Sequence, residues 1–191
     1  MNENMTKKRC DWCGHDDLYK TYHDQEWGVP LYDDQRLFEL LMLESMQAGL
    51  NWLTILKKRE ALREAFSNFD AEKMVRFSPS QVEHMMHDKN IIRNRLKINA
   101  MFKNARAFLL LRERMTLCDF LWGFVDGVPK QNHWNMTHQI PTFSPESEHM
   151  SQVLKKQGFI FVGPVSCYAF MQASGMVNDH IISCFRYKEL S

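Results

Sequence analysis

Apolar residues recur along most of this chain at the three- and four-residue spacing that is typical of helices. The first clear stripe consists of Leu37, Leu40, Leu41 and Ala48. Asp33 or Asp34 can cap its N-terminus, and Gly49 predicts its end, because glycine accepts the left-handed backbone that closes many helices. A helix of about four turns is therefore expected in this region.

A second helix is expected directly afterwards. Asn51 can cap it, and its apolar positions are Trp52, Ile55, Leu56, Leu62 and Phe66. The predicted turn between the two helices consists only of Gly49, Leu50 and Asn51. The side chain at its tip, Leu50, either folds back into the core or projects as a wedge, because proteins that open a duplex insert such side chains into the base stack.

Further helix starts and breaks follow. Ser78-Pro79-Ser80-Gln81 predicts a capping box with proline in the first turn, and Thr116 predicts a shorter helix that extends to Phe124 and ends at Gly127-Val128-Pro129. A long central helix is expected over 91–112. Its buried face is predicted to hold Leu96, Ala100, Met101 or Phe102, Ala105, Phe108 and Leu109. Residues 129–147 show no period and are expected to form an irregular connector.

The last third contains the apolar segment Phe159 to Val162, which alone would suit a short buried strand. A hairpin between two helices is the preferred interpretation, because Pro164 suits a helix start and no second strand is expected for pairing. The apolar run from Val165 to Ala173 then forms the second helix. The predicted fold class is all-α.

Composition narrows the range of functions. The chain has 191 residues, of which 45% are hydrophobic and 12% aromatic, so a single domain with a well-packed core is expected. No apolar segment suits a membrane helix or a signal peptide, which predicts a soluble, cytoplasmic protein. The 24 basic and 23 acidic residues give a net charge of +1, so the overall field does not favour a polyanionic partner. Five cysteines indicate reduced thiols or a metal site.

Both ends of the chain carry candidate metal ligands. His180 and Cys184 are four residues apart, a spacing that places both side chains on one side of a helical turn. Cys10 and His23 supply the same two donor types near the other terminus, and Cys2His2 is an accepted zinc set. The spacing is not that of a zinc finger, and Cys13 and His15 compete as ligands. The alternative is a set of buried thiols and surface histidines.

Glu44 falls within the first apolar stripe rather than on the solvated face of its helix. A carboxylate there needs hydrogen-bond partners. They would be helix ends or an arginine such as Arg93 if Glu44 is structural, and a ligand if it lines a pocket. The aromatic residues nearby in sequence are Trp12, Tyr19, Tyr22, Trp27 and Trp52. Such a set either forms core or, together with one carboxylate, binds a flat, amine-bearing or cationic ring.

Five longer motifs carry a family resemblance. They are Tyr22-His23-Asp24-Gln25-Glu26-Trp27-Gly28-Val29-Pro30, Gln47-Ala48-Gly49-Leu50-Asn51-Trp52, Ile91-Ile92-Arg93-Asn94-Arg95, Gly158-Phe159-Ile160-Phe161-Val162-Gly163-Pro164 and Val177-Asn178-Asp179-His180. In this order, from about Arg9 to Arg186, the chain resembles the bacterial DNA-3-methyladenine glycosylase I family, also called TAG.

The resemblance implies one all-α DNA glycosylase domain over 1–191, of the helix-hairpin-helix superfamily, with the helix-hairpin-helix at about 151–174. It implies one structural Zn²⁺ that connects segments 10–23 and 180–184 through Cys10, His23, His180 and Cys184. By the same resemblance Glu44 recognises the base, Trp52 stacks on it and Tyr22 forms a hydrogen-bonding wall. Trp12, Tyr19 and Trp27 match further aromatic pocket positions. Hairpin amides, including those of Gly158 and Gly163, would bind the DNA backbone, although the usual closely spaced Gly-x-Gly is missing.

The implied activity is hydrolysis of the N-glycosidic bond of 3-methyladenine in double-stranded DNA, by a protein expected to act as a monomer. The base is flipped out and held between aromatic faces while Glu44 accepts a hydrogen bond from its amine. No lysine nucleophile is evident, so excision without strand cleavage is expected. Related superfamily members carry an aspartate where this chain has Asn178, and neither Asn178 nor Asp179 is assigned a catalytic role.

Two other functions fit the same residues. One is a non-catalytic, zinc-containing module that binds lesions or unusual DNA structures and has lost hydrolysis. The other is a zinc-containing structural protein with no DNA role, which the lack of basic excess leaves open. The chain also departs from the commonest family pattern at Asn51, where serine is frequent, and at Ser45-Met46. These positions flank Leu50, so affinity for DNA can differ.

Overall fold

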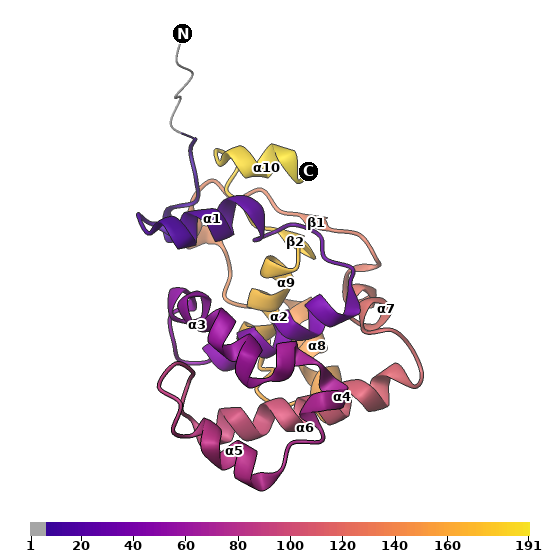
Figure 1. Cartoon of the computed structure of the whole chain (residues 1–191). Coiled ribbons are helices and arrows are strands. Elements are labelled where there is room, and N and C mark those ends of the chain that lie inside the picture. The colour runs from indigo at the N-terminus through magenta and orange to yellow at the C-terminus, as the bar shows by residue number, and fades with distance from the viewer. Residues whose placement is uncertain (1–6) are drawn as a thin grey trace.

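The computed structural model describes residues 7–191, which fold into helices joined by short loops (Figure 1). The α-helices are α1 (Asp17–Gln25), α2 (Asp34–Gln47), α3 (Trp52–Ala65), α4 (Ala71–Met74), α5 (Pro79–Met85), α6 (Arg95–Arg112), α7 (Leu117–Trp122), α8 (Pro145–Lys156), α9 (Pro164–Ala173) and α10 (Phe185–Glu189). Single 3-10 turns lie at Asp11–Cys13, Ser67–Phe69, Gly123–Val125 and Thr137–Gln139. The predicted all-α class is confirmed.

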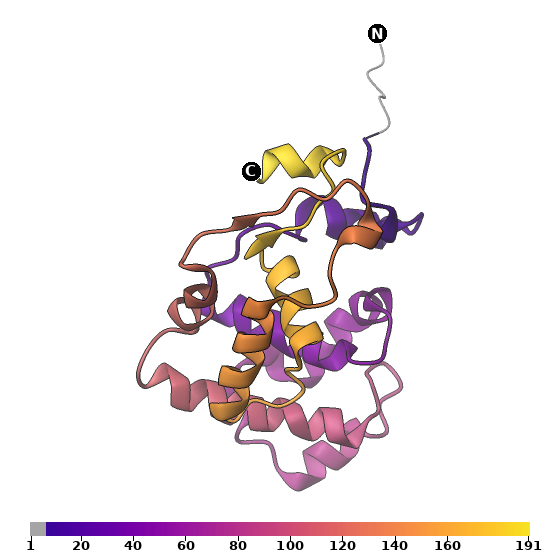
Figure 2. The same ribbon diagram turned by 180° about the vertical axis from the view of Figure 1, so that it is seen from behind.

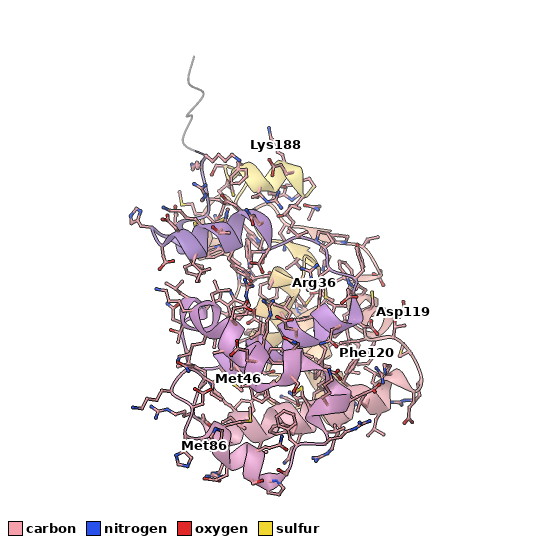
Figure 3. All side chains as sticks on the ribbon, viewed as in Figure 1. Arg36, Met46, Met86, Asp119, Phe120 and Lys188 are labelled. Carbon is pink, nitrogen blue, oxygen red and sulfur yellow. The ribbon has the colours of Figure 1, made fainter. Side chains whose placement is uncertain are left out.

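The two ends of the described chain lie together at one end of the molecule. Helices α1 and α10 are neighbours there, whereas α5 and α6 lie at the opposite end (Figures 1 and 2). Lys188 on α10 and Met86 after α5 mark these two ends (Figure 3). The Phe185 N–H donates to the Lys8 carbonyl oxygen at 2.9 Å, which ties the N-terminal segment to the start of α10.

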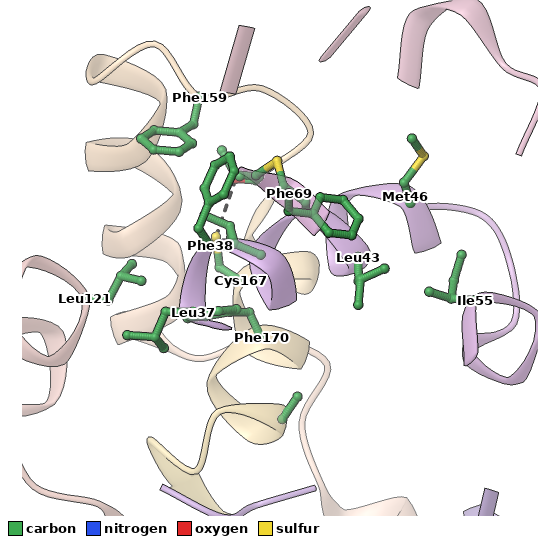
Figure 4. Packing of buried hydrophobic residues seen from close by; sticks show 14 of the residues in the cluster. Leu37, Phe38, Leu43, Met46, Ile55, Phe69, Leu121, Phe159, Cys167 and Phe170 are labelled. Atoms are coloured by element: carbon green, nitrogen blue, oxygen red, sulfur yellow. Dashed lines mark hydrogen bonds between the residues drawn. The ribbon is translucent and has the colours of Figure 1, made fainter. Parts of the chain in front are cut away.

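Helix α2 lies at the centre and contacts α3, α6, α7 and α9. Of its apolar stripe, Leu37 and Leu41 are buried and Leu40 and Ala48 are half-buried. Phe38 stacks on Phe108 of α6 with ring centroids 4.6 Å apart. Figure 4 shows side chains from α2, α3, α7 and α9 converging on this core, together with Phe159 from the loop before α9. Burial of these large apolar side chains is the main source of stability for the fold.

The expected helix ends are found at α2 and α3. The Asp33 carboxylate accepts a hydrogen bond from the Arg36 N–H, and the Asn51 side chain accepts one from the Leu53 N–H. Gly49, the predicted end of α2, has a φ of 76°, which lies in the left-handed region that glycine accepts readily. The short turn between α2 and α3 is therefore as predicted. Ser78 and Gln81 form the predicted capping box, and Thr116 caps α7.

The central helix differs from its prediction in two respects. It begins at Arg95 rather than at Ile91, and Leu96, expected on the buried face, is 71% exposed. Lys97 is buried instead, and its Nζ donates to the carbonyl oxygens of Met46 and Ala48 at 2.7 Å each. These carbonyls end α2 and need donors from outside that helix. Apolar periodicity could not reveal this, because the partners are about fifty residues apart.

The irregular connector is shorter than predicted and contains some regular structure. Ser144 caps α8, which begins at Pro145, so the connector ends before the expected Ser147. Strand β1 (Lys130–Gln131) pairs in parallel with β2 (Val177–Asn178), a two-residue ladder that the sequence pattern did not predict. Helix α1, capped by Asp16, was not predicted either.

The segment between α8 and α9 forms a loop, as preferred over the strand. Asn104 of α6 holds it from both sides, because its amide accepts from the Ile160 N–H and donates to the Ile160 carbonyl oxygen. Among residues 7–191, no helix has the length and apolar character that crossing a membrane requires.

Candidate functional site

A cavity of about 300 Å³ lies between the N-terminal elements and α9. Its walls are Trp12, Tyr19, Tyr22, Trp27, Glu44, Gln47, Trp52, Thr137, Ile140, Ala169 and Gln172. The set includes Glu44 and all five aromatic residues singled out from the sequence. The aromatic residues come from the first 3-10 turn, from α1 and the loop after it, and from α3, so the fold brings together side chains up to forty positions apart.

Glu44 supplies the carboxylate of this cavity from the middle of α2. Its side chain is only 4% exposed, and burial raises its pKa from about 4.5 to about 8. Its Oε2 atom is buried and has no hydrogen-bond partner in the described chain. The alternative in which Arg93 neutralises Glu44 is wrong, because Arg93 is exposed to solvent and no ion pair joins the two.

The aromatic rings enclose the space around this carboxylate. Trp12 contacts Tyr19 and Trp27 with ring centroids 5.0 and 4.9 Å apart, at interplanar angles of 59° and 68°. On another side, Tyr22 and Trp52 lie 5.5 Å apart at 51°. None of these pairs is stacked face to face, so ring faces remain available to a flat ligand.

Four buried polar atoms of the cavity-lining side chains lack hydrogen-bond partners in the described chain. Besides Glu44 Oε2, the buried atoms without a hydrogen bond are Trp12 Nε1, Trp52 Nε1 and Thr137 Oγ1. Only one other such side-chain atom occurs in the described chain, Arg186 Nε. An unsatisfied buried polar group costs about 1–3 kcal/mol, and their concentration in one cavity is typical of a binding site. The site thus offers two indole donors, one hydroxyl and one carboxylate.

Five lining residues were not predicted to belong to the site: Gln47, Thr137, Ile140, Ala169 and Gln172. Gln47 stands in one of the motifs that carried the resemblance. Ala169 and Gln172 are three residues apart on α9, a spacing that places both on one face of that helix. The sequence therefore held some signal for these three residues. Thr137 and Ile140 had none, because they lie in the connector, where no periodicity indicates which side faces inward.

Behind the cavity, Asn178 and Asp179 are fully engaged in hydrogen bonds. The Asn178 amide donates to Gln131 Oε1 and to the Tyr187 carbonyl oxygen at 2.9 and 3.1 Å. Asp179 is completely buried and accepts four hydrogen bonds, from Asn132, Trp134, Tyr168 and Gln172. Neither residue is among those that line the cavity.

A cluster of four candidate metal ligands lies beside this cavity, in contact with its wall residue Trp27. Cys10, His23, His180 and Cys184 are all buried, and one ligand atom from each lies within 4.8 Å of the others. Cys10 Sγ is 3.6 Å from His180 Nδ1, and Cys184 Sγ is 3.5 Å from both His180 Nδ1 and His23 Nε2. The competing Cys13 and His15 are not in the cluster: the Cys13 thiol donates to the Cys10 carbonyl oxygen, and His15 is exposed.

The backbone of this cluster differs from the expected helical turn. His180 precedes a tight turn closed by the Cys184 N–H and the Ile181 carbonyl oxygen, and Cys184 caps α10. Outer partners orient both rings, since His23 Nδ1 is 2.8 Å from Asp24 Oδ1 and His180 Nε2 is 3.2 Å from the Trp27 carbonyl oxygen. Hydrogen bonding with Cys10 and the two imidazoles lowers the pKa of the Cys184 thiol, which favours a thiolate.

Leu50 is 40% exposed at the tip of the α2–α3 turn, so it does not fold back into the core. In the other predicted DNA-contacting loop, Gly158 has a φ of 93° and its N–H donates to the Lys155 carbonyl oxygen, which closes α8. Gly163 is the N-cap residue of α9: its carbonyl oxygen accepts from the Cys167 N–H at 2.8 Å, and its own N–H has no acceptor within residues 7–191. Of the two predicted backbone donors, Gly163 is therefore the one that is free.

The fold and the two sites define a helical protein with an aromatic cavity that contains one buried carboxylate, and with a buried Cys2His2 cluster that joins the two ends of the described chain. Residues 12–187 match the family model described as methyladenine glycosylase. The chain belongs to this family.

Similar proteins span nearly the same length. DNA-3-methyladenine glycosylase 1 of Escherichia coli is 46% identical over 181 residues, which cover 94% of this chain and 97% of that protein. A crystal structure of 3-methyladenine DNA glycosylase I superposes with a TM-score of 0.92 at 47% identity, over 93% and 98% of the two chains. A single-residue variant of such an enzyme in complex with 3-methyladenine has a TM-score of 0.89 at 37% identity, over 93% and 96%.

Proposed function

We propose that this protein is a DNA-3-methyladenine glycosylase that releases the alkylated base by hydrolysis of its N-glycosidic bond, without cutting the strand. The observation that carries the proposal is the unpaired carboxylate oxygen of Glu44, buried in an aromatic cavity of about 300 Å³ in a chain of this family. The comparison proteins are named for the same base.

The cavity suits a purine that carries positive charge. Methylation at N3 makes the attached adenine cationic, and ring faces such as those of Trp52 and Tyr22 attract cations as well as flat surfaces. Glu44 Oε2 accepts a hydrogen bond from the exocyclic amine, and a cationic ring beside this carboxylate favours its ionised form. The unpaired Trp12 and Trp52 indole N–H groups suit the ring nitrogens.

The chemistry that remains is modest. When the C1′–N bond breaks, its electron pair enters the purine ring and cancels the positive charge, so the departing base is neutral. Water adds to C1′ and loses a proton to solvent, which leaves an abasic site. The protein contributes capture and orientation rather than a strong acid or a nucleophile. Unmodified adenine lacks the charge, so its bond stays intact even if it enters the cavity.

The base must first leave the duplex. We assign Leu50 as the wedge that fills the opened stack, because its side chain is exposed and lies three residues after Gln47, which lines the cavity. The free Gly163 N–H at the start of α9 suits a phosphate oxygen. Contacts through backbone amides explain how a chain with a net charge of only +1 holds double-stranded DNA.

We also propose that one structural Zn²⁺ occupies the Cys2His2 cluster. Tetrahedral zinc with bonds of about 2.3 Å to sulfur and about 2.0 Å to nitrogen has a sulfur-to-nitrogen edge of about 3.5 Å. The three sulfur-to-nitrogen distances of 3.5–3.6 Å fit that edge. All four positions would be filled by protein, so the metal would hold residues 10–23 against 180–184 and take no part in hydrolysis.

Release of free 3-methyladenine from methylated duplex DNA tests the function. Wild-type protein is compared with Glu44→Gln and Trp52→Ala. The control is Glu113→Gln, which changes an exposed acidic residue directly after α6. We expect release by the wild type and the control and a loss of at least about a hundredfold in the two pocket variants. A metal-loaded wild type that releases no base would overturn the proposal, and tight retention of methylated DNA without release would identify a non-catalytic binding module.

A further inference from the structure

Asp179 has no remaining capacity for hydrogen bonds. Its Oδ1 accepts from Asn132 Nδ2 and Trp134 Nε1 at 2.7 Å each. Its Oδ2 accepts from the Tyr168 hydroxyl at 2.7 Å and from Gln172 Nε2 at 2.8 Å. An ionised carboxylate accepts about four hydrogen bonds and donates none. Asp179 is also completely buried, so its partners are held in a single arrangement.

This arrangement sets the orientation of the Gln172 amide. Because Asp179 only accepts, the amide must turn its NH2 group toward it, and the flipped orientation would set oxygen against oxygen. Gln172 Oε1 accepts no hydrogen bond from residues 7–191. Gln172 is half-buried and lines the cavity that contains Glu44. The free end of its amide is therefore a hydrogen-bond acceptor for a ligand in that cavity.

We propose that Gln172 Oε1 is a second acceptor for the exocyclic amine of the bound base, and that Asp179 is a positioning residue that keeps this oxygen directed at it. The inference rests on the proposed function and extends it from base binding to the discrimination of an amino group. The amine carries two hydrogens. Glu44, on α2, accepts one, and Gln172, on α9, accepts the other from a different wall of the cavity.

Two acceptors on one amine give sharper selectivity than one. A purine with an oxygen at the same position would place an acceptor against both Glu44 and Gln172, and neither bond would form. Because the orientation of Gln172 is enforced by Asp179, the amide cannot rotate to donate to such a base. The site is thereby tuned to an amine and excludes a carbonyl.

Binding of free bases, followed by quenching of tryptophan fluorescence, tests the role of Gln172 without requiring catalysis. The probes are 3-methyladenine and 3-methylpurine, which lacks the amine. Gln172→Met keeps the side-chain length and removes the amide. We expect it to weaken 3-methyladenine binding about tenfold, the effect of losing one hydrogen bond to a cationic or polar ligand, and to leave 3-methylpurine binding within about twofold of wild type. Equal losses for both probes, or none, would overturn the proposal.

A double-mutant cycle tests Asp179. We expect Asp179→Asn to weaken 3-methyladenine binding about tenfold in the Gln172 background and less than about twofold in the Gln172→Met background, because the positioned oxygen is then already missing. Thermal stability and metal content are measured for all four proteins, so that a loss of folded or metal-loaded protein is distinguished from a loss of affinity. Equal affinity losses in both backgrounds would show a merely structural Asp179. A wild type that binds 3-methyladenine but releases none from DNA would count against the proposed function alone.

Discussion

Trp27 joins the aromatic cavity to the Cys2His2 cluster through direct contact with His180. The two ring centroids are 4.6 Å apart at 81°, and His180 Nε2 lies 3.2 Å from the Trp27 carbonyl oxygen. Trp27 also lines the cavity and contacts Trp12. One wall of the cavity is therefore packed directly against the Cys2His2 cluster that connects the two ends of the described chain.

Removal of a metal ligand is expected to lower stability and to loosen this wall. Cys184→Ser should reduce metal content, measured by elemental analysis, from one zinc per chain to nearly none. The free energy of unfolding should fall by on the order of 4 kcal/mol, as is typical for the loss of a structural metal. Cys118→Ser, at a half-buried thiol on α7, is the matched control and should keep its zinc. Equal metal content and stability in the two variants would contradict the proposed metal site.

The buried carboxylate of Glu44 predicts a pH-dependent cost. Its pKa is raised from about 4.5 to about 8 by burial, so the folded protein retains a proton that the unfolded chain releases in this interval. The stabilisation of the folded state that this retained proton provides is therefore lost as pH rises from about 4.5 to about 8.

Denaturant unfolding of wild type and Glu44→Gln at pH 5 and pH 8 measures this cost. The free energy of unfolding of Glu44→Gln, relative to that of the wild type, should rise by on the order of 3 kcal/mol between pH 5 and pH 8, because glutamine has no charge to bury. A difference that stays constant with pH would mean that Glu44 is solvated or paired in the folded state.

Truncation of the exposed Leu50 should affect DNA processing and leave the fold intact. For Leu50→Ala we expect a change in the free energy of unfolding below about 0.5 kcal/mol and unchanged binding of free 3-methyladenine. Base release from duplex DNA should fall by about tenfold or more, since the opened stack is no longer filled. Leu110→Ala, at a leucine 59% exposed on α6, is the control. Similar release rates for the two variants would contradict a wedge at Leu50.

Lys97 is expected to hold the end of α2 and thereby the turn that carries Leu50. Its Nζ donates to the carbonyl oxygens of Met46 and Ala48. Lys97→Met removes both hydrogen bonds at similar volume and should cost about 2–3 kcal/mol in the free energy of unfolding, because two carbonyls lose a charged donor. Lys103→Met, on the exposed face of the same helix, should cost almost nothing. Chemical denaturation of both variants decides whether the buried lysine has this role.

Local signals in the sequence were sufficient to predict most helices and one feature of the site, the burial of Glu44. Caps at Asp33 and Asn51, the left-handed Gly49 and the apolar stripe of α2 act within one or two turns of a helix, so they could be read directly from residue order. The same stripe placed Glu44 on the buried face. Family resemblance, rather than spacing, singled out Cys10 and His23, because the residues alone left Cys13 and His15 as competing ligands.

Tertiary structure decided what depends on contacts between distant parts of the chain. It brought Cys10 within 3.6 Å of His180, it placed Thr137 and Gln172 in the same cavity as Glu44, and it buried Lys97 where periodicity predicted Leu96. These outcomes follow from hydrogen bonds and packing across fifty to 170 positions, for which the period of a single helix holds no information. The sequence therefore determined the inward faces of α2 and α3, whereas the packing of the helices determined which side chains meet.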